Sequence, residues 1–368
     1  MAEEYVISLA DVEAAASRIS GVVRTTPLLT CTAFDGWASA PVSSSGGGSG
    51  GSGDGSGGST AGRRRVYFKA EPFQLSGSFK ARGASNAVMW LTAEEAARGV
   101  CTHSSGNHAQ ALAAAAAVRG IPATIVMPRD APAIKRAAVE GYGGRVVTCE
   151  PTQAAREAAA AAVAAETGAR FVHPSEDPLV IAGQGTLALE MLAQVADAPR
   201  AAWEAGRPAD APAFDAVIVP VGGGGMISGV ATALRGRDPR IRVFAAEPAA
   251  ADDAARSKAA GAICKHATPP VTVADGLKTT LGPHTWPVVR DLVEDVITVP
   301  EAAIIAAMRL VYERLKVVIE PSAAVGVAAL LSDEFRALPG ITRVGVVLCG
   351  GNVDLDALPF LASRPPAA

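Results

Sequence analysis

Short apolar strands alternate with alanine-rich helices along the middle of this 368-residue chain, and this alternation limits the possible folds more than any other feature. The apolar runs between about residues 97 and 173 lie at 99–102, 123–127, 145–148 and 170–172. Helical stretches follow Ser105, Pro132 and Thr152. Strands joined by helices of this kind usually pair in parallel, because a parallel pair needs a long crossover connection. The pattern therefore predicts an α/β fold built on a parallel sheet.

A second α/β block begins near residue 178, with apolar runs at 216–219, 242–246 and 344–348. Residues 43–58 are almost wholly Gly and Ser and cannot bury apolar surface, so we expect a flexible surface insertion at about 43–63. Residues 197–213, rich in Pro and Ala, are interpreted as a second loop insertion. We expect a discontinuous large domain at 1–94 and 177–368 and a smaller domain at 95–176.

Composition excludes some partners and favours one compartment. The formal net charge is −3 and no basic run stands out, so nucleic acid and anionic membranes are poor partners. The N-terminus does not resemble a signal peptide, and no apolar run could cross a bilayer without small or polar interruption. The five cysteines are scattered without metal-ligand spacing, which is typical of reduced thiols. We expect a soluble, cytoplasmic α/β enzyme.

Lys80 lies among small and apolar residues, where the β-type run at 66–69 should give way to a helix. Desolvation lowers the pKa of an amine, and a lysine in such a place can form a Schiff base with a carbonyl compound. The alternative is an ordinary surface lysine at the start of a helix. Lys80 alone does not decide between these interpretations.

Two further stretches favour the reactive lysine. Residues 102–110, Thr-His-Ser-Ser-Gly-Asn-His-Ala-Gln, open an alanine-rich helix. At 219–226 an apolar strand runs into four glycines and a helix, where backbone N–H groups can converge on a phosphate. A nicotinamide dinucleotide turn is the weaker alternative, because the G-x-G-x-x-G spacing is missing. A reactive lysine together with a phosphate cradle indicates pyridoxal phosphate.

Five motifs then identify a family. SGSFKARGA, SSGNHAQ, VPVGGGGM, AAEPAAADD and LCGGNVDL resemble, in order and spacing from about Ser8 to Leu355, the serine racemase and threonine dehydratase group of pyridoxal-phosphate enzymes. The resemblance implies a two-domain, fold type II architecture like that of the tryptophan synthase β subunit, with a mobile small domain and the cofactor between the domains. It also implies a homodimer that interconverts L- and D-serine and eliminates serine to pyruvate and ammonia.

The resemblance assigns roles around Lys80, which would hold the cofactor and act as a base on one face of the substrate Cα. Racemisation needs a second acid/base on the opposite face, and the resemblance places Ser105 there. The alternative role for Ser105 is a helix N-cap. The remaining cofactor contacts would come from Phe79, Asn107, Gly222, Gly223, Gly224, Gly225, Met226 and Cys349. The substrate would lie against Ser104, Ser105, Asn107, His108 and Thr279, with Arg156 supporting the closed small domain.

The resemblance also implies a divalent cation and a nucleotide. Glu247 and Asp253, with the Ala251 carbonyl between them, would bind Mg²⁺ or Ca²⁺ through oxygen ligands, although two such acids are more often simply solvated. Mammalian-type relatives bind ATP between subunits as an activator, and the matching residues here are Gln110, Lys135, Tyr142, Lys316 and Asn352. Leu75 and Cys31 stand where that pattern has lysine and serine, which predicts weaker activation by ATP.

The cysteine at position 349 leaves functions other than serine racemisation open. The family position faces the pyridine nitrogen and is usually Ser in racemases, whereas Cys occurs among threonine dehydratases; a buried inert Cys is the plain alternative. A neutral group there would leave the nitrogen unprotonated, which suits racemisation with elimination. The first alternative is a threonine or serine dehydratase with little racemase activity. A second alternative is a racemase or dehydratase of aspartate or 3-hydroxyaspartate, of which His103 disfavours only the racemisation of aspartate. A third is a non-catalytic pyridoxal-phosphate-binding protein.

Overall fold

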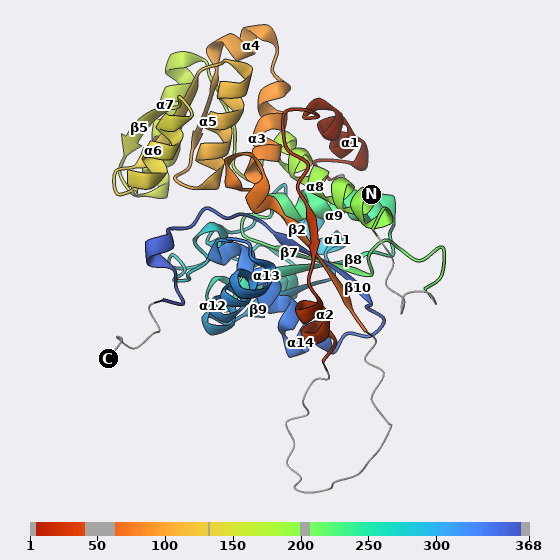
Figure 1. Cartoon of the computed structure of the whole chain (residues 1–368). Coiled ribbons are helices and arrows are strands. Elements are labelled where there is room, and N and C mark those ends of the chain that lie inside the picture. Colours follow the sequence, from red (N-terminus) through yellow and green to blue (C-terminus); the bar gives the residue numbers. More distant parts are fainter. Residues whose placement is uncertain (1–4, 41–62, 132, 199–206, 362–368) are drawn as a thin grey trace, which may run out of the picture.

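The computed structural model describes residues 5–40, 63–131, 133–198 and 207–361, and these form two lobes, each built on its own sheet (Figure 1). The six-stranded sheet has the order β1 (Leu28–Thr30), β2 (Arg65–Ala70), β10 (Arg343–Leu348), β7 (Ala216–Pro220), β8 (Arg242–Pro248) and β9 (Asp295–Val299). In this sheet β1 pairs antiparallel with β2, and the other neighbours are parallel.

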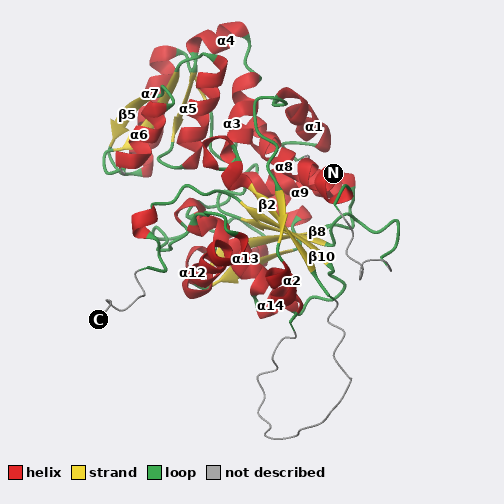
Figure 2. Cartoon of the chain, viewed as in Figure 1, coloured by secondary structure: helices red, strands yellow, loops and turns green. Residues whose placement is uncertain are grey.

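The four-stranded sheet of the smaller lobe is parallel throughout. Its order is β5 (Arg145–Cys149), β4 (Ala123–Pro128), β3 (Val100–His103) and β6 (Arg170–Phe171). Both sheets are flanked by helices, as the colouring by secondary structure shows (Figure 2). The predicted α/β fold with parallel sheets is confirmed. The Gly/Ser-rich stretch at 43–58 and residues 199–206 of the second expected insertion lie outside the described residues.

The helices begin where the sequence offers caps. Ser8 with Asp11 and Thr92 with Glu95 form capping boxes, and Asp177 caps the longest helix with Pro178 behind it. The helices are α1 (Leu9–Arg18), α2 (Thr32–Ser39), α3 (Lys80–Met89), α4 (Ala93–Arg98), α5 (Asn107–Arg119), α6 (Ala133–Gly141), α7 (Gln153–Thr167), α8 (Pro178–Ala196), α9 (Gly225–Arg237), α10 (Asp253–Ala260), α11 (Trp286–Leu292), α12 (Glu301–Leu310), α13 (Pro321–Leu331) and α14 (Asp333–Arg336).

Helix α3 lies between the lobes and packs against both α5 and α8. Its residues Ala84, Ala87 and Val88 are fully buried in the apolar cluster of the smaller lobe. The helix is covalently continuous with β2 of the six-stranded sheet through the short turns at 71–79. It therefore belongs to both lobes, and the domain boundary at 94/95 stays a prediction.

Helix α8 crosses its two neighbours at points where only glycine fits. A Cβ on Gly183 would lie 2.6 Å from the Cα of Gly83 in α3. A Cβ on Gly185 would lie 2.6 Å from the carbonyl oxygen of Gly229 in α9. Contacts this short are excluded for a real side chain, so glycine is what lets the three helices approach. Through them α8 connects the helix that begins at Lys80 with the helix that begins at Gly225.

Helix α8 is also long and apolar enough, by length and composition, to cross a membrane, with 61% of its most apolar window buried inside the protein. Its contacts with α3 and α9 identify it as a core helix of this fold. A polar Gln184 lies in its middle, and the Oε1 atom of Gln184 accepts a hydrogen bond of 3.1 Å from the Gly83 N–H. This bond adds to the glycine crossing between α3 and α8.

A buried network of four charges joins β2, α3 and α8. Arg82 is fully buried, and its guanidinium donates to Glu71 at 2.8 Å and to Glu190 at 2.7 Å. Lys69, also fully buried, donates to Glu190 at 2.7 Å and to the Thr26 carbonyl at 2.8 Å. Two positive and two negative groups balance, so no net charge is buried.

We predict that Arg82→Met destabilises the protein by about 3–5 kcal/mol, because the change leaves carboxylates buried without their partner. The measurement is the free energy of unfolding from urea titration of the apoprotein. Arg237→Met is the matched control: it breaks an exposed pair with Glu13, with side-chain exposures of 52% and 42%, and should cost less than about 1 kcal/mol. A loss below about 1 kcal/mol for Arg82→Met would contradict the prediction.

Candidate active site

Lys80 is the first residue of α3 and is held in place by its neighbours. The Phe79 N–H donates to the Cys349 carbonyl at 3.0 Å, which ties the start of the helix to the end of β10. The Lys80 Nζ donates to the Pro174 carbonyl at 2.7 Å and lies 5.1 Å from the centre of the Phe79 ring. Burial lowers the pKa of Lys80 to about 8, although nearby Cys349 and Glu320 favour its charged form.

The four glycines form a tight turn between β7 and α9. Gly224 has φ = +82°, in the left-handed region that glycine adopts freely. A Cβ on Gly223 would lie 2.7 Å from the Ser175 Oγ, and a Cβ on Gly225 would lie 2.8 Å from the Ser175 carbonyl oxygen. The first N–H groups of a helix have no acceptor inside the helix, so the start of α9 offers several donors to an anion. The turn can therefore hold a phosphate group.

Asn107, the first residue of α5, belongs to a polar cluster with a residue that the sequence analysis missed. Its Nδ2 donates to both carboxylate oxygens of Glu320, at 2.9 and 3.0 Å, and its Oδ1 accepts from Asn352 Nδ2 at 2.9 Å. Burial raises the pKa of Glu320 to about 7. The Cys349 Sγ lies 3.9 Å from a Glu320 oxygen, and burial raises the pKa of this thiol well above its usual value. Cys349 is therefore neutral at physiological pH.

Ser104 and Ser105 lie in the loop between β3 and α5. The Ser104 N–H donates to the Val126 carbonyl at 3.1 Å, and its Oγ accepts from the Gly106 N–H at 3.3 Å. The N-cap of α5 is Gly106, which makes no side-chain capping bond. The alternative that Ser105 serves only as the N-cap of α5 is therefore not supported, because its hydroxyl does not cap this helix.

His108 is buried and lies next to Asn107 on α5. Its Nε2 lies 3.2 Å from the Val172 carbonyl, and its Nδ1 has no hydrogen-bond partner among the described residues. Burial and the nearby Lys80 lower the pKa of His108 to about 3, so the ring is neutral. Since Nε2 faces a carbonyl, it carries the proton and Nδ1 is an acceptor.

The last two predicted substrate residues lie on opposite sides of the site. The Thr279 Cγ2 would lie 3.4 Å from a Cβ on Gly223, which places Thr279 against the glycine turn. Arg156 lies on the first turn of α7, and its Nε is buried without a hydrogen-bond partner among the described residues. The role expected for Arg156, as a support of the closed small domain, stays a prediction.

Glu247 and Asp253 are both buried at the end of β8 and the start of α10. Glu247 accepts from the N–H groups of Ala254 and Ala255, at 3.2 and 2.7 Å. Asp253 accepts from the Leu281 N–H at 3.1 Å, and its other oxygen lies 3.2 Å from His266 Nε2. Burial raises the pKa of both carboxyls, that of Glu247 to about 8.

No group of three or more His, Cys, Asp or Glu side chains in the described part of the chain could hold a metal. A cation at Glu247 and Asp253 would thus need main-chain oxygen atoms, such as the Ala251 carbonyl, and water. Two buried carboxylates fit a hard cation, because its positive charge would offset the cost of ionising both.

The five predicted nucleotide residues occupy several elements. Lys135 on α6 forms an ion pair of 3.0 Å with Asp275 of the larger lobe, and Lys316 has a left-handed backbone with φ = +61°. Asn352 donates to Asn107, as described above, and also to the Ser76 carbonyl at 2.8 Å. The remaining two, Gln110 and Tyr142, lie on α5 and directly after α6. No hydrogen bond or ion pair joins these five residues to one another in the described part of the chain.

Comparison with known proteins identifies the group to which this site belongs. Residues 56–350 match the family model described as pyridoxal-phosphate dependent enzyme. The chain belongs to this family. A serine racemase of Arabidopsis thaliana is 46% identical over 361 residues, which cover 97% of this chain and 96% of that protein. A β-hydroxyaspartate dehydratase of Paracoccus denitrificans is 49% identical over 296 residues, covering 80% and 88%. The solved structure of maize serine racemase has a TM-score of 0.84 and 43% identity, covering 96% of each chain.

The residues present fit the cofactor of this pyridoxal-phosphate-dependent family. The glycine turn leaves no room for Cβ atoms on its Ser175 side, and it offers helix N-terminal donors to a phosphate. Lys80 supplies an amine of lowered pKa, Asn107 a fixed amide, and Cys349 a neutral thiol. When bound, pyridoxal phosphate supplies an electron sink for the electrons left on Cα after proton removal.

The structure also reveals contributors that sequence reasoning did not name. The Pro174 carbonyl holds Lys80, Ser175 packs on the glycine turn, and Glu320 orients Asn107. The segment His-Pro-Ser-Glu-Asp-Pro at 173–178 has no residue spacing that indicates a chemical role. Glu320 before Pro321 resembles an ordinary helix start, so only its tertiary contacts reveal it.

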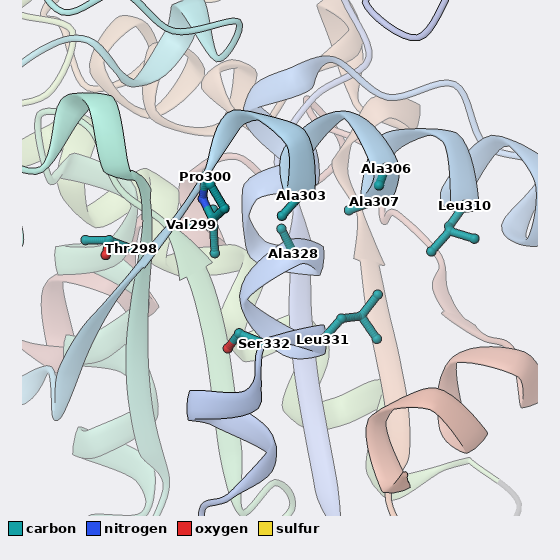
Figure 3. Close-up of a pocket in the computed structure, with 10 residues that line it drawn as sticks. All are labelled: Thr298, Val299, Pro300, Ala303, Ala306, Ala307, Leu310, Ala328, Leu331 and Ser332. Atoms are coloured by element: carbon teal, nitrogen blue, oxygen red, sulfur yellow. The ribbon is translucent and has the colours of Figure 1, made fainter. Parts of the chain in front are cut away.

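A separate hollow of about 300 Å³ lies between β9, α12 and α13 (Figure 3). None of its lining residues is ionisable or belongs to the predicted site. They are Thr298, Val299, Pro300, Ala303, Ala306, Ala307, Leu310, Ala328, Leu331 and Ser332. This hollow therefore offers none of the acid–base groups that the site around Lys80 provides.

We predict that the Lys80 amine of the apoprotein reacts with an amine-labelling reagent with a midpoint near pH 8, because burial lowers its pKa to about 8. Ordinary lysines have a pKa of about 10.4 and should label with a midpoint about two pH units higher. Mass spectrometry of labelled peptides across pH gives both midpoints in one experiment. A Lys80 midpoint above pH 10 would contradict the assignment.

Proposed function

We propose that this protein interconverts L- and D-serine and also dehydrates serine to pyruvate and ammonia, with pyridoxal phosphate as cofactor. The observation that carries the proposal is Lys80, whose pKa of about 8 gives a larger neutral fraction of amine near physiological pH than an ordinary lysine has, in a chain similar over nearly its whole length to serine racemases. Serine itself, as the substrate, follows from these relatives.

Lys80 and Ser105 divide the acid–base work in this proposal. The neutral Lys80 amine accepts the proton from Cα on one face of the substrate, and the Ser105 hydroxyl returns a proton on the other face. Ser105 is available for this step because Gly106, and not Ser105, is the N-cap of α5. Ser104, Asn107 and Thr279 would hold the substrate carboxylate, and His108 would contribute through its main-chain N–H in the first turn of α5, because its ring offers only an acceptor.

A dehydratase with little racemase activity is the second candidate, and Cys349 favours it. The thiol is neutral and buried at the position that faces the pyridine nitrogen in the family, where dehydratases carry Cys. The identity of 49% with a β-hydroxyaspartate dehydratase supports elimination chemistry on this framework. The ratio of racemisation to elimination depends steeply on the difference between the two activation barriers, because a change of about 1.4 kcal/mol in that difference alters the ratio about tenfold.

We propose further properties for the same protein. Buried Glu247 and Asp253 support a structural Mg²⁺ or Ca²⁺. All five cysteines are free, which supports a reducing, cytoplasmic location. A homodimer is supported by Phe73 and Val318, which are 47% and 46% exposed and flank the close approach of Pro72 to Gly351.

We predict that Ser105→Ala lowers the rate of D-serine formation from L-serine at least about 100-fold, because one of the two acid–base groups is lost. Pyruvate formation from L-serine should persist, since Lys80 still removes the Cα proton. D-serine and pyruvate are followed together after adding L-serine, Mg²⁺ and cofactor. Ser17→Ala, an exposed serine on α1, is the matched control. Pyruvate without D-serine from the unaltered protein would favour the dehydratase.

We propose weak activation by ATP, because Leu75 stands where the nucleotide-binding pattern has lysine. Leu75→Lys restores one cation, so the ATP concentration for half-maximal activation should fall roughly ten- to a hundredfold. Activity is titrated with ATP at fixed Mg²⁺. Val118→Lys, at a residue 55% exposed on α5, controls for a general gain of positive charge. An unchanged activity–ATP curve for Leu75→Lys would contradict this reasoning.

A further inference from the structure

The segment at 173–178, His-Pro-Ser-Glu-Asp-Pro, connects β6 to α8 and lies against the glycine turn. His173 Nδ1 accepts from the N–H groups of Ser175 and Glu176, at 3.2 and 3.0 Å, which fixes the bend of the segment. The Pro174 carbonyl then accepts from Lys80, and Ser175 packs on Gly223 and Gly225. Glu176 is the member of the segment to which no role has yet been given.

Glu176 reaches across to the loop at 282–285 that precedes α11. Its Oε1 accepts from the Thr285 hydroxyl at 2.9 Å, and its Oε2 accepts from the His284 N–H at 2.8 Å. The Glu176 carbonyl oxygen also lies 2.8 Å from His284 Nδ1. A Cβ on Gly282 would lie 2.2 Å from the Glu176 carboxyl carbon, so a side chain at 282 would displace this carboxylate. The carboxylate, with a side-chain exposure of 16%, is therefore held from two sides.

Thr285 connects Glu176 to the glycine turn. Its side chain is fully buried, and its hydroxyl oxygen lies 3.0 Å from the Gly223 carbonyl oxygen, as a donor. The same oxygen accepts from the Gly282 N–H at 3.1 Å. The Gly282 carbonyl oxygen lies 3.3 Å from the same hydroxyl, so its single proton can go to only one of three acceptors at a time. Glu176 holds the loop through the His284 N–H and the Thr285 hydroxyl, and the loop in turn places that hydroxyl against the Gly223 carbonyl.

The Gly223 carbonyl and the Gly224 N–H belong to one planar trans peptide and point in opposite directions. When Thr285 holds the carbonyl, the Gly224 N–H is directed away from Thr285. Rotation of this peptide would replace a donor with a carbonyl oxygen, which repels an anion. Because Gly224 is in the left-handed region and has no side chain, its own conformation does little to prevent that rotation.

We propose that Glu176 and Thr285 are positioning residues: together they fix the Gly223–Gly224 peptide so that the glycine turn presents N–H groups to the cofactor phosphate. The proposal rests on the pyridoxal-phosphate function given above and deepens it. It assigns the loop at 282–285 a part in cofactor binding, although neither residue touches the reacting atoms.

The test is titration of the apoprotein with pyridoxal phosphate, using protein fluorescence for the dissociation constant and phosphorus NMR for the bound phosphate. Thr285→Val and Glu176→Ala are each expected to raise the dissociation constant about tenfold and to shift the phosphorus resonance. Thr285→Ser keeps the hydroxyl and should restore most of the affinity. The double variant Glu176→Ala/Thr285→Val should be no weaker than the weaker single variant, because both changes act through one hydroxyl.

Thr298→Val and Glu166→Ala are the matched controls, since both residues are exposed and lie outside the glycine turn and its contacts. Dissociation constants within twofold of the wild type for Thr285→Val and Glu176→Ala, with an unchanged phosphorus resonance, would overturn the proposal. Fully additive losses in the double variant would do so as well. If Thr285→Val does not fold, Glu176→Met takes its place, since it removes both carboxylate acceptors at similar side-chain volume; unchanged cofactor affinity in that variant would be equally decisive.

The titration is independent of turnover, so it separates this proposal from the racemase assignment. A protein that binds pyridoxal phosphate through the Thr285 contact but forms no D-serine overturns the racemase and supports the positioning role. If the unaltered protein forms D-serine but the Thr285→Val variant binds the cofactor with normal affinity, the racemase assignment is supported and the positioning role is overturned.

Discussion

The pairing of Arg82 with Glu71 and Glu190 is the interaction on which the rest of this structure depends. Arg82 stands two residues after Lys80 on the same helix, so whatever fixes its side chain also fixes the start of α3. The network joins β2, α3 and α8 and is closed by Lys69, which leaves its charges balanced. Ion pairs of this kind add little net stability compared with apolar packing, but they strongly penalise any arrangement in which one partner is missing. Their effect here is to define one position for the reactive lysine.

Helix α8 also fixes the position of Lys80 relative to the glycine turn, because it packs against both α3 and α9. It crosses α3 at Gly83 and Gly183, and it crosses α9 at Gly185 and Gly229. Backbones in such close contact leave little freedom to slide, because packed interiors have no spare volume. Lys80 at the start of α3 and Gly225 at the start of α9 are therefore fixed relative to each other by helix packing.

Around Lys80, burial shifts the ionisation of several groups toward their neutral forms. Desolvation lowers the pKa of Lys80 and His108 and raises those of Glu320 and Cys349. Neutral groups suit a site that must hold an anionic phosphate and a substrate carboxylate while moving a proton at Cα. A neutral amine can accept that proton, and a neutral thiol would leave the pyridine nitrogen without one.

The sequence by itself determined the fold class and the family, and it singled out Lys80 and the glycine turn. These features depend on local order: strands and helices alternate at a readable period, and Lys80 and Gly222 to Gly225 stand in short contiguous motifs. Tertiary structure alone decided that Gly106 caps α5, that Glu320 orients Asn107, and that Glu176 meets Thr285. Glu320 and Asn107 are more than 200 residues apart along the chain, and Glu176 and Thr285 more than 100. No periodicity or spacing encodes such contacts, because they form only when separate elements pack together.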